Sequence, residues 1–143
     1  MGVTFPGMDA LRAVLEVDAR IAYALVFGSQ ARGTAGATSD FDIALGLCAG
    51  ASLDALALGG LVSDVERVTG RRVDLVELDR AAPGLAYRIF RDGCLIFERD
   101  HAALAARRAR AYLEYLDFQP TEALLARGIL EAATRGRPTA PGR

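Results

Sequence analysis

Short apolar segments recur along the first hundred residues, and their period changes from one segment to the next. Residues 21–27 (IAYALVF) are apolar throughout and end at Gly28, which favours a buried strand over a helix. Residues 41–47 (FDIALGL) alternate large apolar side chains with small or acidic ones, which predicts a strand with one face in the core and one open face. Residues 73–78 (VDLVEL) predict a third strand, and residues 94–97 (CLIF) predict a short edge strand.

Helical spacing of apolar residues predicts helices between these strands. The expected helices cover residues 8–20, run from a cap at Ser52 or Asp54 to Gly70, and lie between Pro83 and Gly93. Polar caps and first-turn prolines are common where helices begin, and glycines are common where they end. Residues 1–98 are therefore expected to form a core in which strands and helices alternate.

The C-terminal third differs in composition. Residues 100–117 are rich in alanine, leucine and arginine and predict a helix, which Pro120 is expected to end because proline lacks an amide hydrogen. A second helix is expected over residues 121–133. We expect the helices of residues 99–134 to pack on the core or on a partner, and residues 135–143 to form a flexible tail.

Composition narrows the class of protein. A chain of 143 residues forms one domain with a sizeable core. Its 17 basic and 18 acidic residues leave a net charge of -1, which argues against a protein that coats nucleic acid. All the basic residues are arginine, so lysine takes no catalytic role. Cys48 and Cys94 are far apart, and neither a signal peptide nor a membrane-spanning run is present, so we expect a cytoplasmic protein.

The residues that suggest chemistry lie between the first two expected strands. Asp40 and Asp42 stand two positions apart where a strand begins, so their carboxylates face the same side and favour a bound cation such as Mg²⁺. Gly28 and Ser29, at the preceding turn, offer backbone amides and a hydroxyl to a phosphate, and Arg32 adds a forked cation.

A third carboxylate, Asp74, lies in the middle of an apolar strand, where a charge is normally costly. If that strand neighbours residues 41–47, Asp74 faces the other two carboxylates and is a candidate metal ligand or base. Glu77 lies three positions further on and therefore points to the other face of the strand, so we exclude it from the site.

This order of residues resembles the nucleotidyltransferase superfamily of the DNA polymerase β type: a Gly-Ser pair, ten residues, an Asp-x-Asp pair and a later strand carboxylate. The short chain, the Ala-Arg-Gly after the serine and the run SDFDIA are most similar to the minimal nucleotidyltransferases (MNT). These proteins are the antitoxin half of HEPN/MNT toxin–antitoxin pairs. The resemblance covers about residues 10–98.

The resemblance implies an α/β (α+β) nucleotidyltransferase fold, with a small mixed sheet flanked by helices and with C-terminal helices. It implies ATP as cosubstrate, one or two Mg²⁺ ions, and transfer of AMP to a tyrosine hydroxyl of a HEPN ribonuclease partner, which is thereby silenced. The metal-binding and catalytic carboxylates would be Asp40, Asp42 and Asp74, and the nucleotide-binding residues would be Gly28, Ser29 and Arg32. Neither membrane contact nor direct binding of nucleic acid is expected.

Two other functions remain open. The acceptor could be a small molecule, although relatives of that kind are longer, or the chain could neutralise a toxin by binding it alone, with a vestigial site. The only histidine, His101, lacks the nearby preceding arginine of the HEPN ribonuclease motif, so we expect the antitoxin alone, in a hetero-oligomer with its toxin. His101 itself is expected to be a solvated residue where a helix begins.

Several residues also have purely structural interpretations. Asp74 could pair with an arginine, and Arg32 could be an ordinary surface residue. The segment that follows residue 106 could be a docking face for a toxin or RNA, or simply the solvated side of a helix. Its basic and aromatic residues are Arg107, Arg108, Arg110, Tyr112 and Tyr115.

Overall fold

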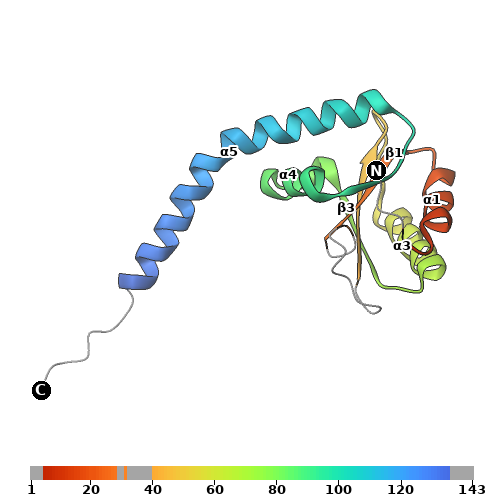
Figure 1. Ribbon diagram of the computed structural model, residues 1–143, viewed down its shortest axis with the longest axis horizontal. Coiled ribbons are helices and arrows are strands. Elements are labelled where there is room, and N and C mark those ends of the chain that lie inside the picture. Colours follow the sequence, from red (N-terminus) through yellow and green to blue (C-terminus); the bar gives the residue numbers. More distant parts are fainter. Residues whose placement is uncertain (1–4, 29–30, 32–39, 136–143) are drawn as a thin grey trace, which may run out of the picture.

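The computed structural model describes residues 5–28, 31 and 40–135, and its elements are labelled as in Figure 1. Four strands form one mixed sheet in the order β3-β2-β1-β4. They are β1 (Ile21–Phe27), β2 (Phe41–Leu47), β3 (Val73–Glu77) and β4 (Cys94–Glu98). β1 runs antiparallel to both β2 and β4, whereas β2 and β3 are parallel. The expected mixed sheet is confirmed, and β4 is an edge strand as predicted.

Helices cover both faces of this sheet. They are α1 (Met8–Val17), α3 (Ala55–Thr69), α4 (Pro83–Asp92) and α5 (His101–Arg135), and a short 3-10 helix, η1 (Leu78–Arg80), follows β3. α1 and α3 lie on one face, and α4 and the beginning of α5 lie on the other (Figure 1). α3 makes the crossover that a parallel pair of strands requires.

The predicted helix boundaries have local physical causes. The Asp54 carboxylate accepts a hydrogen bond of 2.7 Å from the amide of Ala57, so Asp54 rather than Ser52 caps α3. Gly70 ends α3 with a φ of 68°, a left-handed conformation that favours glycine. Pro83 occupies the first turn of α4, and Gly93 follows its last residue, as the sequence predicts.

The expectation of an open face on β2 is wrong. Ala44 is fully buried, because α4 covers the face that was expected to be open. Gly46 is also buried, and a Cβ atom there would overlap the ring of Tyr23 from β1. Ala44 and Gly46 on this face of β2 are small because α4 and the Tyr23 ring approach the backbone closely. The strand is therefore covered on both sides.

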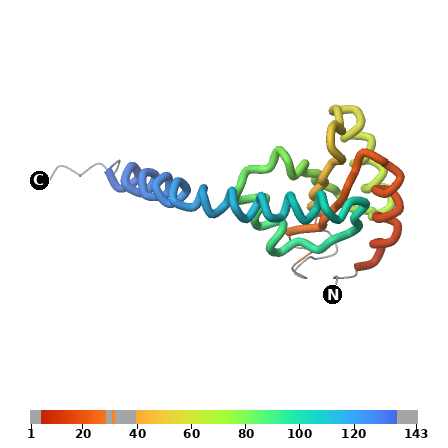
Figure 2. Tube along the Cα trace, turned by 90° about the horizontal axis from the view of Figure 1, so that it is seen from above, coloured from red at the N-terminus to blue at the C-terminus, as the bar shows by residue number. Residues whose placement is uncertain are grey.

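The expected break at Pro120 is also wrong, because α5 continues as one helix from His101 to Arg135. Proline removes one hydrogen bond and crowds the preceding turn, which can kink a helix without ending it when both flanks favour helix formation. The helix changes direction along its course (Figure 1), and its second half extends away from the core (Figure 2). Every residue from Thr121 to Arg135 is exposed. No helix in the described ranges has the length and apolar character needed to cross a membrane.

Candidate functional site

The strand pairing brings two of the predicted carboxylates together. In the parallel register of β2 and β3, Asp42 lies beside Asp74, so both side chains project from the same face of the sheet. Asp42 is partly buried and Asp74 is exposed. Asp40 is exposed and lies one residue before β2 begins. Adjacent strands are about 4.8 Å apart, so Asp42 and Asp74 are close neighbours.

Gly28 completes this arrangement from the other side. β1 is antiparallel to β2, and Phe27 is opposite Asp42, so the chain turns away from β1 directly beside the Asp42 carboxylate. Gly28 has a φ of 71°, which L side chains rarely adopt. A Cβ atom at this position would also collide with Oδ2 of Asp42. Glycine is therefore required here for its backbone conformation and for the space that the carboxylate occupies.

Two of the predicted nucleotide-binding residues, Ser29 and Arg32, lie outside the described residues. Their roles therefore stay predictions. The geometry of the candidate site rests on Gly28, Asp42 and Asp74, with Asp40 at its margin.

The ion pairs of β3 agree with the assignment of Asp74, and not Glu77, to the candidate site. Within the described ranges, Asp74 makes no ion pair, so no arginine of these ranges takes the structural role that the sequence left open. Glu77 instead lies 3.2 Å from Nε of Arg80, and it projects from the opposite face of β3. Asp74 is thus an exposed carboxylate beside a second carboxylate.

A divalent cation fits the chemistry of this pair. Carboxylate oxygens are the ligands that Mg²⁺ prefers, and two neighbouring carboxylates stabilise each other poorly without a cation. Among the described residues, no three histidine, cysteine, aspartate or glutamate side chains gather as a metal-binding group. The strand register thus joins Asp42 to Asp74, while Asp40 precedes β2 and is not part of this strand pairing.

α4 contributes residues to the surroundings of the site that no motif in the sequence indicates. A cavity of about 290 Å³ adjoins the turn at Gly28, and its walls come from the end of β1 and from α4. Its lining residues are Phe27, Gly28, Leu85, Arg88, Arg91 and Asp92. An arginine pair on the helix after the third carboxylate was visible in the sequence, but only the packing of α4 places it beside Gly28.

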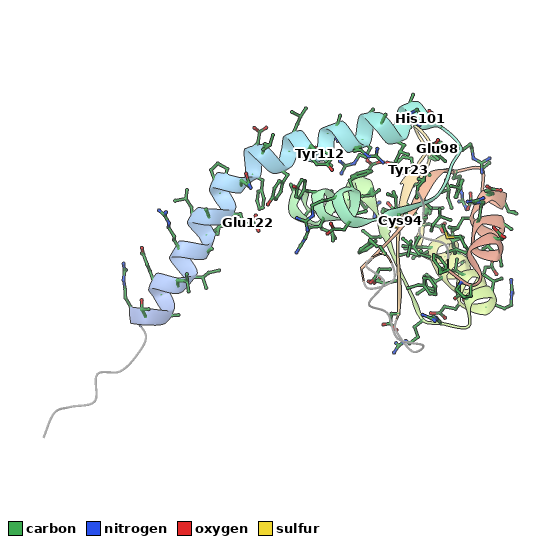
Figure 3. All side chains as sticks on the ribbon, viewed as in Figure 1. Tyr23, Cys94, Glu98, His101, Tyr112 and Glu122 are labelled. Atoms are coloured by element: carbon green, nitrogen blue, oxygen red, sulfur yellow. The ribbon has the colours of Figure 1, made fainter. Side chains whose placement is uncertain are left out.

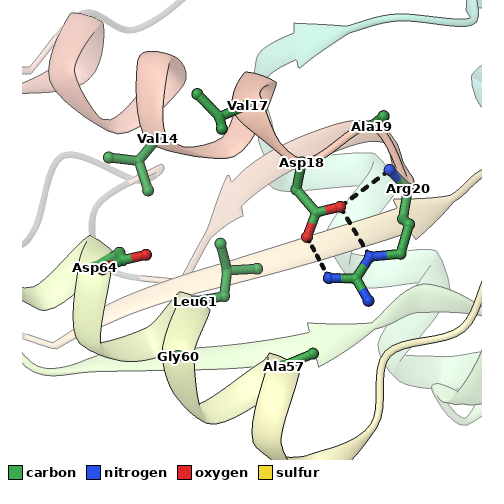
Figure 4. Close-up of a pocket in the computed structure, with 9 residues that line it drawn as sticks. All are labelled: Val14, Val17, Asp18, Ala19, Arg20, Ala57, Gly60, Leu61 and Asp64. Carbon is green, nitrogen blue, oxygen red and sulfur yellow. Dashed lines mark hydrogen bonds and ion pairs between the residues drawn. The ribbon is translucent and has the colours of Figure 1, made fainter.

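Another cavity, of about 440 Å³, lies elsewhere, between α1 and α3 (Figure 4). It is bordered by an ion pair in which Nη2 of Arg20 lies 2.8 Å from Asp18. The hydrogen bonds from Arg20 lower the pKa of the Asp18 carboxyl. None of the predicted site residues lines this groove, and it lies on the face of the sheet opposite Asp42 and Asp74.

The proposed docking face on α5 is largely occupied within the chain. Arg107 is only 6% exposed and donates a hydrogen bond of 2.8 Å to the carbonyl of Leu78. The ring of Tyr115 stacks on Tyr87 of α4 with 3.9 Å between centroids. These two residues hold α5 against the core, whereas Arg108, Arg110 and Tyr112 are exposed, so the docking interpretation stays a prediction for them. His101 is exposed where α5 begins, beside Glu98 (Figure 3), which confirms the expected solvated position.

Comparison with known proteins is consistent with this geometry. Residues 9–102 match the family model described as Polymerase beta, Nucleotidyltransferase. No curated protein is significantly similar to the chain. A crystal structure of a toxin–antitoxin with AMP-PNP has a TM-score of 0.76 at 20% identity, with 86% of this chain and 98% of that chain covered.

Two further solved structures are similar. A complex from Shewanella oneidensis of a tri-AMPylated HEPN toxin with MNT antitoxin has a TM-score of 0.71 at 18% identity, covering 87% of this chain and 96% of that chain. A structure named as a minimal nucleotidyltransferase has a TM-score of 0.50 at 34% identity, covering 59% of this chain and 87% of that chain. The chain therefore belongs to the polymerase β nucleotidyltransferase family, and it has the fold found in MNT toxin–antitoxin complexes.

Proposed function

We propose that this chain is a cytoplasmic antitoxin that transfers AMP from ATP to a tyrosine hydroxyl of a cognate HEPN ribonuclease toxin and thereby silences it. The observation that carries the proposal is the contact set of Gly28, Asp42 and Asp74, in a chain of the nucleotidyltransferase family. A HEPN toxin is proposed as the acceptor because a similar complex contains a tri-AMPylated HEPN toxin, and the tyrosine hydroxyl is what the resemblance to the minimal nucleotidyltransferases implies.

The proposed reaction is an in-line displacement at the α-phosphorus of ATP. The acceptor oxygen forms a bond to this phosphorus, the bond to the bridging oxygen of the β-phosphate breaks, and pyrophosphate leaves. The exposed carboxylate of Asp74 is free of ion pairs among the described residues and is a candidate to accept the hydroxyl proton. Gly28 leaves room at the turn for the Asp42 carboxylate, and its backbone amide is proposed to bind a phosphate.

We further propose that Asp42 and Asp74 hold one or two Mg²⁺ ions, with Asp40 contributing from the margin. The pairing of Asp42 with Asp74 supports this assignment. When bound, the metal supplies positive charge to the phosphate oxygens during transfer. The carboxylates hold it in place, and Ser29 and Arg32 are proposed to bind the phosphates.

The exposed part of α5 supports a protein as the acceptor. Six large apolar side chains of this helix are between 59% and 70% exposed, although side chains of this type are usually buried. They are Leu113, Leu116, Leu124, Leu125, Ile129 and Leu130. Exposed apolar residues gathered on one element are typical of protein–protein contact sites. A small-molecule acceptor gives no reason for their exposure.

The first observation is whether a HEPN reading frame lies next to this gene. The test is then the intact mass of that HEPN protein after incubation with this chain, ATP and Mg²⁺. We expect a gain of one or more AMP groups, and a loss of at least about 100-fold in rate for Asp42→Asn. Asp64→Asn is the matched control, because Asp64 is a half-exposed carboxylate of α3 that pairs with Arg67. Peptide mapping then identifies whether the modified residue is a tyrosine.

The outcomes separate the alternatives. A toxin that stays unmodified but is inhibited at equal stoichiometry without ATP would make the chain a binding antitoxin. A chain that consumes ATP in the presence of small hydroxyl compounds but leaves the toxin unmodified would favour the small-molecule acceptor. Equal transfer by Asp42→Asn and Asp64→Asn would remove Asp42 from the proposed site.

A further inference from the structure

α4 brings cationic side chains to the edge of the candidate site. The buried residues of this helix, Ala86, Ile89 and Phe90, belong to the same cluster as Leu25 and Ala44 of the sheet. α4 therefore lies over the face from which Asp42 projects, since Asp42 and Ala44 share that face of β2.

One stripe of α4 points to the turn at Gly28. Leu85, Arg88 and Asp92 are spaced by three and four residues, so they lie on the same side of the helix. All three line the cavity of about 290 Å³ that Phe27 and Gly28 close from the sheet. Arg88 is thus in the wall of a cavity that Gly28 also lines, and Gly28 lies against the Asp42 carboxylate.

The two arginines of this cavity differ in their contacts. Arg91 makes two hydrogen bonds of 2.9 and 2.8 Å to the carboxylate of Asp92, and its guanidinium lies 5.5 Å from the centre of the Tyr87 ring. Arg88 donates only from Nε, over 3.2 Å, to the carbonyl of Gly84, and within the described ranges it makes no ion pair. The backbone contact orients Arg88 and leaves its terminal amino groups available.

The negative charge of a bound nucleotide favours a cationic side chain such as Arg88 beside the phosphates. A triphosphate carries several negative charges beside the carboxylates of Asp42 and Asp74, and metal ions offset only part of them. The chain contains no lysine, so every side-chain cation that could bind phosphate at neutral pH is an arginine. The guanidinium fork matches two phosphate oxygens at once.

We infer that Arg88 binds the phosphate chain of the nucleotide in this cavity, while Arg91 is held by Asp92 and Tyr87 as part of the wall. This inference rests on the proposed function in taking ATP as the nucleotide. It adds a binding residue from α4 to a site that the sequence confines to the two motif strands and the turn between them. Arg88 contacts the nucleotide and not the acceptor.

The experiment measures binding and turnover separately. Binding of AMP-PNP and of AMP, each with Mg²⁺, is followed by isothermal titration calorimetry for the unaltered chain, Arg88→Gln and Arg88→Lys. Arg67→Gln is the matched control, because Arg67 is an exposed helical arginine on α3, away from the cavity. The KM values for ATP and for the toxin are measured in the AMP-transfer assay. Circular dichroism checks that each variant is folded.

We expect Arg88→Gln to weaken AMP-PNP binding about tenfold or more, since hydrogen bonds between charged groups are strong. Arg88→Gln should weaken AMP binding less than AMP-PNP binding, because AMP has one phosphate. Arg88→Lys should bind AMP-PNP more tightly than Arg88→Gln but less tightly than the unaltered chain. The KM for ATP should rise while the KM for the toxin stays unchanged. Arg67→Gln should match the unaltered chain in every measurement.

Other results overturn the inference. Equal AMP-PNP binding by Arg88→Gln and Arg67→Gln would show that Arg88 has no contact with phosphate. Equal losses for AMP and AMP-PNP would place Arg88 near the nucleoside, and a change only in the KM for the toxin would place it on the acceptor side. Absence of AMP-PNP binding by the unaltered chain would also refute it. Binding that depends on Arg88 without AMP transfer would instead refute only the proposed function.

Discussion

The variant Gly28→Ala, compared with Gly70→Ala, separates two reasons for a glycine at position 28: its left-handed backbone conformation and the space that the Asp42 carboxylate occupies. The residue has a φ of 71°, and its added Cβ would collide with Oδ2 of Asp42. Gly70→Ala is the matched comparison, because Gly70 has a φ of 68° and an added Cβ there meets nothing within 4 Å. Both variants carry the conformational cost, and only Gly28→Ala displaces a carboxylate.

The magnitudes follow from these two contributions. A left-handed alanine costs about 1–2 kcal/mol relative to glycine, so both variants should lose stability by that amount. The carboxylate of Asp42 is the end of a side chain, and it must retreat by roughly 1 Å to reach ordinary contact distance from the new Cβ. A misplacement of about 1 Å in a catalytic group can lower the rate about 100-fold. Gly28→Ala should therefore lose transfer far more than it loses stability.

The assay pairs urea unfolding with AMP transfer measured by intact mass. We expect the two variants to differ by less than about 1 kcal/mol in the free energy of unfolding, because a side-chain end can move at low cost. Transfer by Gly28→Ala should fall about 100-fold below that of Gly70→Ala. If both variants transfer AMP at similar rates, the close approach of Gly28 to Asp42 has no role in the reaction, and our account of the site is wrong.

Three further predictions concern the fold. Gly46→Ala should lose at least about 2 kcal/mol in urea unfolding, because its Cβ would overlap the buried Tyr23 ring. Burial raises the pKa of Tyr23 to about 12. The unfolded tyrosine therefore ionises first, and stability should fall between pH 10 and about 12 by roughly 2 to 3 kcal/mol, a fall that Tyr23→Phe should lack. Hydrogen bonds from Arg20 lower the pKa of Asp18, so ionised Asp18 stabilises the fold above its ordinary pKa of 3.8, and this stabilisation is lost as the pH falls below that value. Asp18→Asn should therefore lose less stability on acidification than the unaltered chain. Equal acid unfolding curves for the two chains would contradict this.

The local elements and the order of the chemical groups could be predicted from the sequence alone. The apolar run of residues 21–27 forms β1, and Asp54 and Gly70 bound α3, because burial, capping and left-handed backbone are properties of a few neighbouring residues. The motif order also predicted that Asp74 belongs beside Asp42, and the parallel register of β2 and β3 bears this out.

Features that depend on contacts between residues distant in the chain could not be predicted in this way. Ala44 was expected on an open face, but α4 buries it, and a pattern of small residues cannot reveal which element approaches. Pro120 leaves α5 continuous, since the helix-forming residues on both sides outweigh one missing hydrogen bond. Arg88 enters the candidate site only because α4 packs across the sheet beside Gly28. Contacts of this kind arise from packing between elements, for which the local sequence carries no periodic signal.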